Sequence, residues 1–172
     1  MDLIKSIEAR TSVREFTSED VPEEIVTEAL RLAVLAPSAG NLQARDFVVV
    51  RDPETKKKLA KGAFGQEFVQ EAPVVIVVCA NLNRIRNYGS RGTNLYCIQD
   101  SAAAVEHILL YAASQGFGSC WVGAFDEKEV AMVLSLPDCD RPVAMIPIGR
   151  PSEAPRRTPR LSIDTVVHRE KW

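Results

Sequence analysis

The feature that most constrains the fold is the run Pro73–Leu82, "PVVIVVCANL", which is almost continuously apolar and rich in β-branched residues. β-Branched side chains favour extended backbone. A strand that is apolar on both faces has to be covered on both faces. The run therefore predicts a central strand with other elements packed against each side of it.

Helical and extended patterns alternate along the rest of the chain. Apolar residues recur at helical spacing from Pro22 to Val34, and Leu95–Gln115 is apolar around most of its circumference, which predicts a buried helix. The other expected helices are Leu3–Ala9, Pro53–Ala63, Gly65–Ala72 and Asp126–Leu136, and the other expected strands are Asp46–Arg51, Ser119–Phe125 and Arg141–Pro151. This order predicts an α+β or α/β arrangement of two or three layers, formed by a single domain over residues 1–172.

The composition gives no reason to expect a nucleic acid or a membrane as partner, because the net charge is only -2 and no uncharged run reaches membrane-spanning length. The N-terminus lacks the apolar segment of a signal peptide. The four cysteines are widely spaced and only two histidines could join them, so free thiols are favoured over a zinc site. We therefore expect a cytoplasmic protein without a metal.

The common catalytic and nucleotide-binding motifs are missing. "GFGSCW" at 116–121 lacks the final glycine of a dinucleotide loop, and it leads from a helix into a strand, the reverse of the Rossmann order. No phosphate-binding P-loop and no nucleophile elbow is present. If the protein is an enzyme, we expect a bound cofactor to carry the chemistry and no side chain to act as the catalyst.

The positive signal is "ARTSVREF" at 9–16, in which Arg10, Ser12 and Arg14 alternate. In extended backbone these three side chains point the same way. Two guanidinium groups and a hydroxyl suit an anion with several oxygens, such as a phosphate. The alternative is that both arginines are ordinary surface residues in a polar loop.

A second signal lies in the C-terminal tail, residues 150–172. Proline- and arginine-rich sequence precedes a small apolar group there, formed by Leu161, Ile163, Val166 and Val167. Such a segment is too short to form a core of its own. We expect it to pack on another surface, and a second subunit is the obvious candidate.

Taken together, five stretches resemble the nitroreductase family of FMN-dependent oxidoreductases, in the family's order and spacing. They are "RTSVREF", "APSAGNLQARDF", "EAPVVIVVCA", "GFGSCWVGAF" and "IPIGRPSEAPRRTPR". The resemblance implies an α+β fold with a mostly antiparallel central sheet flanked by helices. It also implies an intertwined homodimer that binds one FMN at each of two subunit interfaces, with the tail embracing the partner.

The resemblance also implies a set of FMN-binding residues. Arg10, Ser12 and Arg14 match the residues that hold the phosphate and ribityl chain, although many family members carry a second arginine where Thr11 stands. Arg157 and Arg160 match the basic residues that complete the phosphate site. The segment that the partner subunit supplies around the flavin is matched by Pro37, Ser38, Ala39, Asn41 and Gln43. The strand beside the flavin ring is matched by Trp121, Val122 and Gly123.

Several of these residues, and some others, have a structural alternative. Gln43 and Arg45 could cap the edge of the following strand, Trp121 could pack in the core, and Gly123 could form a bulge. Two further residues or segments are interpreted as structural, namely His107 as a hydrogen-bonded core residue and Lys56–Lys58 as a solvated helix face.

The activity implied by the resemblance is the transfer of two electrons from NADH or NADPH to a small acceptor, such as a nitroaromatic or a quinone, in a ping-pong cycle. Arg14 is the candidate for stabilising negative charge on the reduced flavin if it does not bind phosphate. Asn81–Asn94, the least patterned segment, is where we expect a lid and the acceptor selectivity. The alternatives are reductive dehalogenation, oxidation of a bound substrate, or a flavin-binding protein without turnover.

Overall fold

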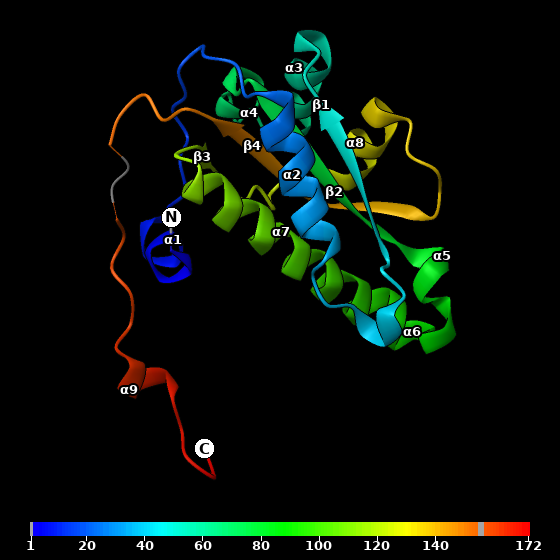
Figure 1. Cartoon of the computed structure of the whole chain (residues 1–172). Helices are drawn as coiled ribbons and strands as arrows, with labels where there is room; N and C mark the ends of the chain where they lie inside the picture. Colours follow the sequence, from blue (N-terminus) through cyan, green and yellow to red (C-terminus); the bar gives the residue numbers. More distant parts are fainter. Residues whose placement is uncertain (1, 155–156) are drawn as a thin grey trace.

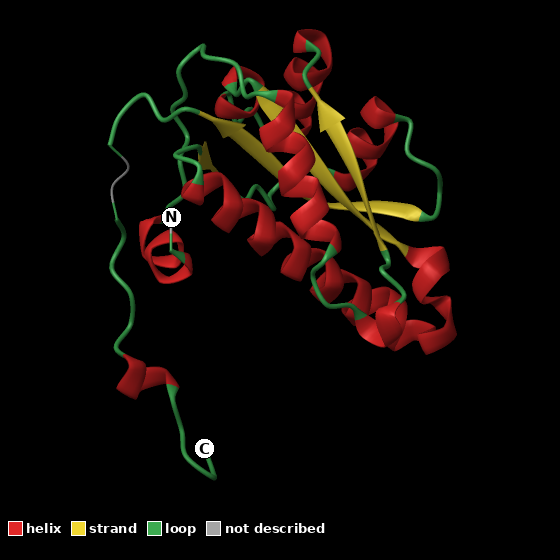
Figure 2. Cartoon of the chain, in the orientation of Figure 1, coloured by secondary structure: helices red, strands yellow, loops and turns green. Residues whose placement is uncertain are grey.

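The computed structural model describes residues 2–154 and 157–172 and contains an antiparallel sheet with helices on both faces (Figures 1 and 2). The strand order is β1-β2-β4-β3. The strands are β1 (Arg45–Val50), β2 (Val74–Asn81), β3 (Gly118–Ser119) and β4 (Asp140–Gly149). This architecture confirms the α+β prediction.

The longer helices are α1 (Leu3–Ala9), α2 (Glu23–Val34), α3 (Pro53–Gly62), α7 (Cys97–Ser114) and α8 (Glu127–Leu134). The shorter helical segments are η1 (Ala39–Asn41), α4 (Phe68–Glu71), α5 (Leu82–Ile85), η2 (Arg86–Tyr88), α6 (Gly89–Arg91), η3 (Gly92–Tyr96) and α9 (Ile163–Val166).

Strand β2 is the centre of the molecule, as its sequence predicts. It pairs with β1 on one side and with β4 on the other, and every one of its residues is buried. The core residues Val74, Ile76 and Val78 face one layer of helices. Alternate residues between them face the other layer. The strand is therefore covered on both faces.

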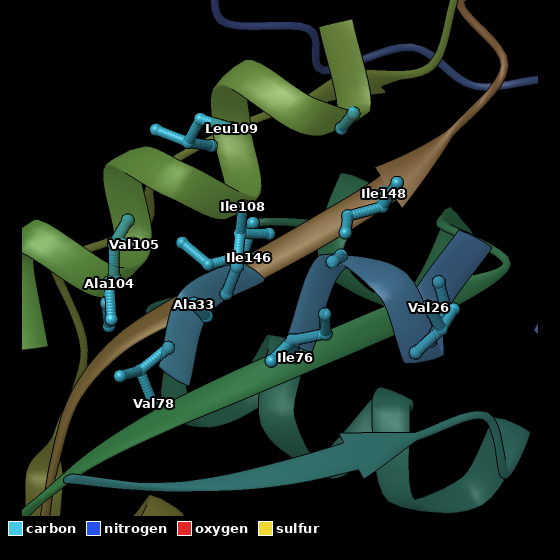
Figure 3. Packing of buried hydrophobic residues seen from close by; sticks show 14 of the residues in the cluster. Val26, Ala33, Ile76, Val78, Ala104, Val105, Ile108, Leu109, Ile146 and Ile148 are labelled. Carbon is cyan, nitrogen blue, oxygen red and sulfur yellow. The ribbon is translucent and has the colours of Figure 1, made fainter. Parts of the chain in front are cut away.

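Helices α2 and α7 pack against one face of the sheet (Figure 3). Val26 and Ala33 of α2 and Ile108 of α7 meet the strand residues there. His107 lies at the edge of this layer, where its Nδ1 makes a hydrogen bond of 2.9 Å with the carbonyl oxygen of Leu32. The hydrogen bond predicted for His107 is confirmed, but the residue is only partly buried and does not belong to the core.

Helices α3, α4 and α8 cover the opposite face. Asp52 caps α3 and Asp126 caps α8, each through side-chain oxygens that accept backbone N–H groups. The predicted start of a helix at Asp126 is therefore confirmed. Lys56 of α3 differs from its prediction as part of a solvated face, because it is only 7% exposed and its Nζ donates to the carbonyl oxygen of Ala72 at 2.6 Å. Burial lowers the pKa of Lys56.

The predicted strand Ser119–Phe125 is wrong beyond its first residue. Ser119 pairs with Ile148 of β4, so the next position falls opposite Pro147. Cys120 donates to the carbonyl oxygen of Pro147, but proline has no N–H to donate in return. The regular ladder ends there, and only an isolated bridge between Val122 and Met145 continues it.

The segment before α7 is folded rather than loose. The predicted helix from Leu95 starts at Cys97, and the five residues before it form the wider turn η3. Gly92 is required at the start of that turn, because a Cβ there would lie 2.7 Å from the carbonyl oxygen of Ile85 and 2.7 Å from the Cβ of Tyr88. Short helical turns in this segment are set by such contacts, which apolar periodicity does not reveal.

The C-terminal tail runs away from the sheet and extends past α1 (Figure 1). Leu161 and Ile163 are 74% and 70% exposed, and Val166 and Val167 are exposed as well. Leu3, Ile4 and Ile7 of α1 are also exposed.

None of the helices among residues 2–154 and 157–172 combines the length and the apolar character needed to span a bilayer.

Candidate functional site

The segment that follows α1 lies against strand β3. The Val13 N–H donates to the carbonyl oxygen of Ser119 at 2.9 Å, and Ser12 forms a parallel bridge with Ser119. Val13 is buried, whereas Ser12 and Arg14 on either side of it are exposed. The expected alternation of side chains is therefore present in this segment.

Gly118 makes this close approach of the two segments possible. A Cβ at this position would lie 2.7 Å from the Cβ of Val13, which is closer than carbon atoms can pack. The side chain of Val13 fills the space above the glycine. The position of the Arg10–Arg14 segment therefore depends on β3.

The pKa of the buried Cys120 thiol is affected by Arg10, Ser12 and Arg14. Burial raises the pKa of the Cys120 thiol, while the charge of Arg14, the hydroxyl of Ser12 and the charge of Arg10 each lower it. The bridge between Ser12 and Ser119 places this segment beside Cys120. Arg14 also lies over the ring of Phe68, with its guanidinium carbon 5.8 Å from the ring centre.

A pocket of about 540 Å³ lies between α1, α7 and the tail. Arg10, Arg157 and Arg160 line it, together with Glu8 and Glu106. Guanidinium groups bind phosphate oxygens through paired N–H donors, so three arginines at one pocket fit the phosphate of a nucleotide such as FMN. Pro155 and Arg156 of the tail motif lie outside the described residues.

Thr11 stands where many members of the resembled family have a second arginine. Thr11 lines the 540 Å³ pocket and also a smaller one of about 140 Å³ beside Ala113 and Gly116. Its hydroxyl oxygen is buried and has no hydrogen-bond partner among the described residues.

The second predicted group, residues 37–43, forms the connection between α2 and β1. The Ala39 N–H donates to the Asp100 carboxylate near the start of α7, and the Gln43 N–H donates to the Ser38 hydroxyl. Pro37, Gly40, Asn41 and Gln43 are exposed. The loop therefore presents polar side chains and backbone groups to its surroundings.

The two predicted groups lie toward opposite ends of α7. Thr11 shares its smaller pocket with Ala113 near the end of α7, whereas Ala39 is bound to Asp100 near the beginning. Thirteen helical residues separate Asp100 from Ala113, which corresponds to about 20 Å along the axis. The arginine pocket is lined by Glu106, six positions after Asp100 and about 9 Å further along the axis, so the loop and the Arg10–Arg14 segment of one chain contact α7 about 9 to 20 Å apart.

The third predicted group follows β3 along the chain. Trp121 is 42% exposed, so the alternative that it packs in the core is wrong. Val122 is buried, and Gly123 is exposed with open space around it, since the nearest atom to a Cβ there would be 4.0 Å away. The bridge between Ser12 and Ser119 places this group beside the Arg10–Arg14 segment.

Two buried charged residues shape the loop in a way that the sequence did not predict. Arg45 is buried, and it donates to carbonyl oxygens at the end of α2 rather than capping the edge of β1. Asp100 carries no assigned role in the sequence analysis, yet its carboxylate accepts the N–H of Ala39. A charged residue inside an apolar helical pattern was the available signal for Asp100, whereas nothing local marked Arg45.

Comparison with known proteins gives consistent results. The model of the nitroreductase family matches residues 7–67 and 60–150. The chain is 34% identical to an NADH dehydrogenase of Thermus thermophilus, over 92% of this chain and 91% of that protein. It is 30% identical to an FMN reductase [NAD(P)H] of Bacillus subtilis, over 99% of this chain and 74% of that protein. The solved structure of B. megaterium NfrA2 matches with a TM-score of 0.92 at 30% identity, covering 100% of this chain and 76% of that one. The chain belongs to the nitroreductase family.

Proposed function

We propose that this protein is an FMN-dependent oxidoreductase that transfers two electrons from NADH or NADPH to a small acceptor. The observation that carries the proposal is the pocket lined by Arg10, Arg157 and Arg160, next to the segment of Ser12 and Arg14. The relative in B. subtilis that is named as an FMN reductase [NAD(P)H] supports the same activity.

The arginines of the pocket would bind the FMN phosphate. Three guanidinium groups outnumber the two carboxylates of Glu8 and Glu106, so the pocket retains a net positive charge. Arg10 extends from the end of α1, whereas the other two belong to the tail. We therefore assign the phosphate to both segments at once, and its binding would fix the tail against the body of the molecule.

Trp121, Val122 and Gly123 would lie beside the flavin ring. Bound FMN supplies the two-electron redox chemistry, because no protein side chain here can accept a hydride. Gly123 leaves space for a flat ring to approach the backbone. Arg14 supplies a fixed positive charge suited to the negative charge of a reduced flavin. One exposed face beside Trp121 would serve donor and acceptor in turn, in a ping-pong order.

We propose that the active form is a homodimer in which the loop 37–43 of one chain reaches the flavin site of the other. The separation of about 9 to 20 Å along α7 between the two groups supports this arrangement. The apolar residues left exposed on α1 and in the tail support it independently, since monomers rarely expose contiguous apolar surface.

The segment Asn81–Asn94 is our candidate for acceptor selectivity. Tyr88 is exposed and lies directly against Gly40 of the loop, where a Cβ would meet its hydroxyl. Its ring packs edge to face on Tyr96, with the ring centres 5.4 Å apart. These aromatic side chains suit a flat acceptor such as a nitroaromatic or a quinone.

The free thiols of all four cysteines support a cytoplasmic location.

An anaerobic titration tests the proposed activity. FMN-loaded protein is mixed with NADH or NADPH, and the flavin absorbance is followed until it bleaches. Nitrofurazone, a quinone or a halotyrosine is then added, and recovery of the absorbance identifies the acceptor. Bleaching followed by recovery with the first two supports the proposal. Recovery only with the halotyrosine indicates dehalogenation, and bound flavin that neither nucleotide bleaches indicates a binding protein without turnover.

A further inference from the structure

The loop 37–43 has an unusual backbone. Gly40, Asn41 and Gln43 all have positive φ angles, of 56°, 56° and 50°. For residues other than glycine this conformation costs of the order of 1–3 kcal/mol, and it persists only where the surroundings impose it. Something in the structure must therefore hold this loop.

Arg45 holds the loop from inside the protein. Its side chain is buried, with 4% exposure, although it carries a full charge. The guanidinium donates to four backbone carbonyl oxygens, at 3.0, 2.6, 3.2 and 3.2 Å. These oxygens belong to Val34, Ala36, Pro37 and Asp100. One side chain therefore joins the end of α2 and the first residue of the loop to α7.

Asp100 holds the middle of the loop. It is 5% exposed, and its Oδ1 accepts the N–H of Ala39 at 2.9 Å, one residue before the first left-handed position. Its Oδ2 is buried without a hydrogen-bond partner among the described residues. The charge of Asp100 raises the pKa of Arg45, while burial, the larger effect, lowers it. Both side chains are buried and carry opposite charges, but Arg45 donates to the backbone carbonyl oxygen of Asp100 and not to its carboxylate.

The outer side of the loop is supported by the segment that follows β2. Arg84 donates to the carbonyl oxygens of Gln43 and Arg45, at 3.1 and 2.8 Å. Tyr88 covers Gly40, since a Cβ there would lie 2.5 Å from the tyrosine hydroxyl. The loop is thus held on two sides, while Ser38, Asn41 and Gln43 carry its polar side chains.

We propose that Arg45 and Asp100 are positioning residues that hold loop 37–43 in its cofactor-binding shape. This inference rests on the proposed function. Buried charged residues are a weak source of stability, because apolar residues of similar volume often serve as well. These two residues instead orient the loop, because they form hydrogen bonds with particular carbonyl and N–H groups of its strained backbone. The pair therefore acts on the flavin through the loop and does not touch it.

The test compares Arg45→Met and Asp100→Leu with Lys56→Met. Lys56 is a matched control, because it is also a buried cation bound to backbone carbonyl oxygens, but it lies between α3 and α4. The measurements are the melting temperature, the FMN dissociation constant, and the amide hydrogen exchange of residues 38–43 in cofactor-free protein. Asp100→Asn is included because it keeps an oxygen that can accept the N–H of Ala39.

We expect the FMN dissociation constants of Arg45→Met and Asp100→Leu to be at least about tenfold higher than that of Lys56→Met. This difference should be larger than any difference in melting temperature between the variants accounts for. The amides of Ala39 and Gln43 should exchange faster in these two variants only. Asp100→Asn should recover most of the affinity lost in Asp100→Leu. Unchanged exchange in the loop, or FMN affinity that merely follows melting temperature in all variants, would overturn the inference.

The hydrogen-exchange measurement separates the two levels of the argument. If wild-type protein fails to take up FMN, the proposed function fails, and with it the cofactor role of the pair. Faster loop exchange in cofactor-free Arg45→Met still reports whether the pair holds the loop. If wild-type protein binds FMN and the variants bind it equally well, the proposed function stands and the inference alone is wrong.

Discussion

At the scale of single residues, Arg10 offers a direct test of the phosphate site. It lines the 540 Å³ pocket and supports no ion pair that the fold depends on among the described residues. Removing a charged hydrogen bond to phosphate is expected to cost about 1.5–3 kcal/mol of binding free energy, which corresponds to about tenfold to a hundredfold in affinity. Arg10→Ala should therefore weaken FMN binding by this amount and leave the melting temperature nearly unchanged.

The control for this experiment is Arg31→Ala. Arg31 is an exposed arginine of α2 that pairs with Glu28 three residues before it, so the variant removes the same charge away from the pocket. Its FMN dissociation constant, measured by fluorescence titration, should equal that of the wild type. Equal affinities in both variants would assign Arg10 to the ordinary surface arginines.

A second residue-scale prediction concerns Asp140 at the start of β4. Burial and the neighbouring charge of Asp46 raise the pKa of Asp140 above its usual value of 3.8. Between the usual and the raised pKa, the folded state binds more protons than the unfolded state, so this residue's contribution to stability falls as the pH rises. Asp140→Asn should remove that loss and stabilise the protein at neutral pH by roughly 0.5 kcal/mol.

The measurement is the free energy of unfolding of both proteins from pH 3 upward. The difference between Asp140→Asn and wild type should be close to zero below pH 3.8 and become positive as the pH rises toward neutrality. Taking the difference removes the opposite contribution of groups such as Glu127, whose pKa is lowered by its hydrogen bonds with Arg141. A difference that is flat or negative at neutral pH would contradict this account of Asp140.

At the scale of elements, two glycines near β3 should respond differently. A Cβ on Gly118 would meet Val13 at 2.7 Å, so Gly118→Ala has to push the Arg10–Arg14 segment away, at a cost of about 1–3 kcal/mol. Gly123 has open space around it, so Gly123→Ala should leave the melting temperature unchanged. Because Gly123 is expected beside the flavin ring, its alanine variant should still bind FMN less tightly.

Thermal unfolding and FMN titration of both variants decide the matter. Loss of stability in Gly118→Ala with little loss in Gly123→Ala supports the contact between the first segment and β3. If Gly123→Ala binds FMN with wild-type affinity, the flavin ring lies away from this strand.

The elements that the sequence predicts well are those whose patterns reflect burial alone. The continuous apolar run of β2 has both faces in the core, and Asp126 marks the first residue of α8 through its side-chain cap. The strand expected over Ser119–Phe125 ends early because Pro147 stands opposite Cys120, and this depends on a register that only the folded chain defines. Lys56 is similar, since its charge suggests solvent while its partner Ala72 lies sixteen residues away.

The candidate site also has features that the local sequence reveals and features that depend on the fold. The alternation of Arg10, Ser12 and Arg14 is local, so the sequence alone indicates a group that suits an anion. The convergence of Arg10 with Arg157 and Arg160 on one pocket depends on the path of the tail past α1. Local patterns do not reveal such long-range contacts.

At the scale of the whole molecule, the tail should determine the oligomeric state. Leu161, Ile163, Val166 and Val167 are exposed in the single chain, and burial on a partner could contribute roughly 1.5–2 kcal/mol for each side chain. Deleting 161–172 should therefore give monomers or aggregates. It should also release FMN, since the site is expected to span the interface.

Sedimentation velocity and flavin absorbance of the truncated protein are measured together. As a control, Met132→Ala removes an equally exposed apolar side chain from α8, away from α1 and the tail, and should remain dimeric. A truncated protein that stays a stable monomer with FMN bound would place the interface elsewhere.

The central claim is that this chain binds FMN through its arginine pocket, and the absorbance spectrum of the purified protein tests it most directly. We expect a yellow protein that contains, or takes up on titration, about one FMN per chain and binds FAD much more weakly, because no adenosine-binding loop is present in the sequence. A colourless protein that takes up no FMN at saturating concentration would contradict the account.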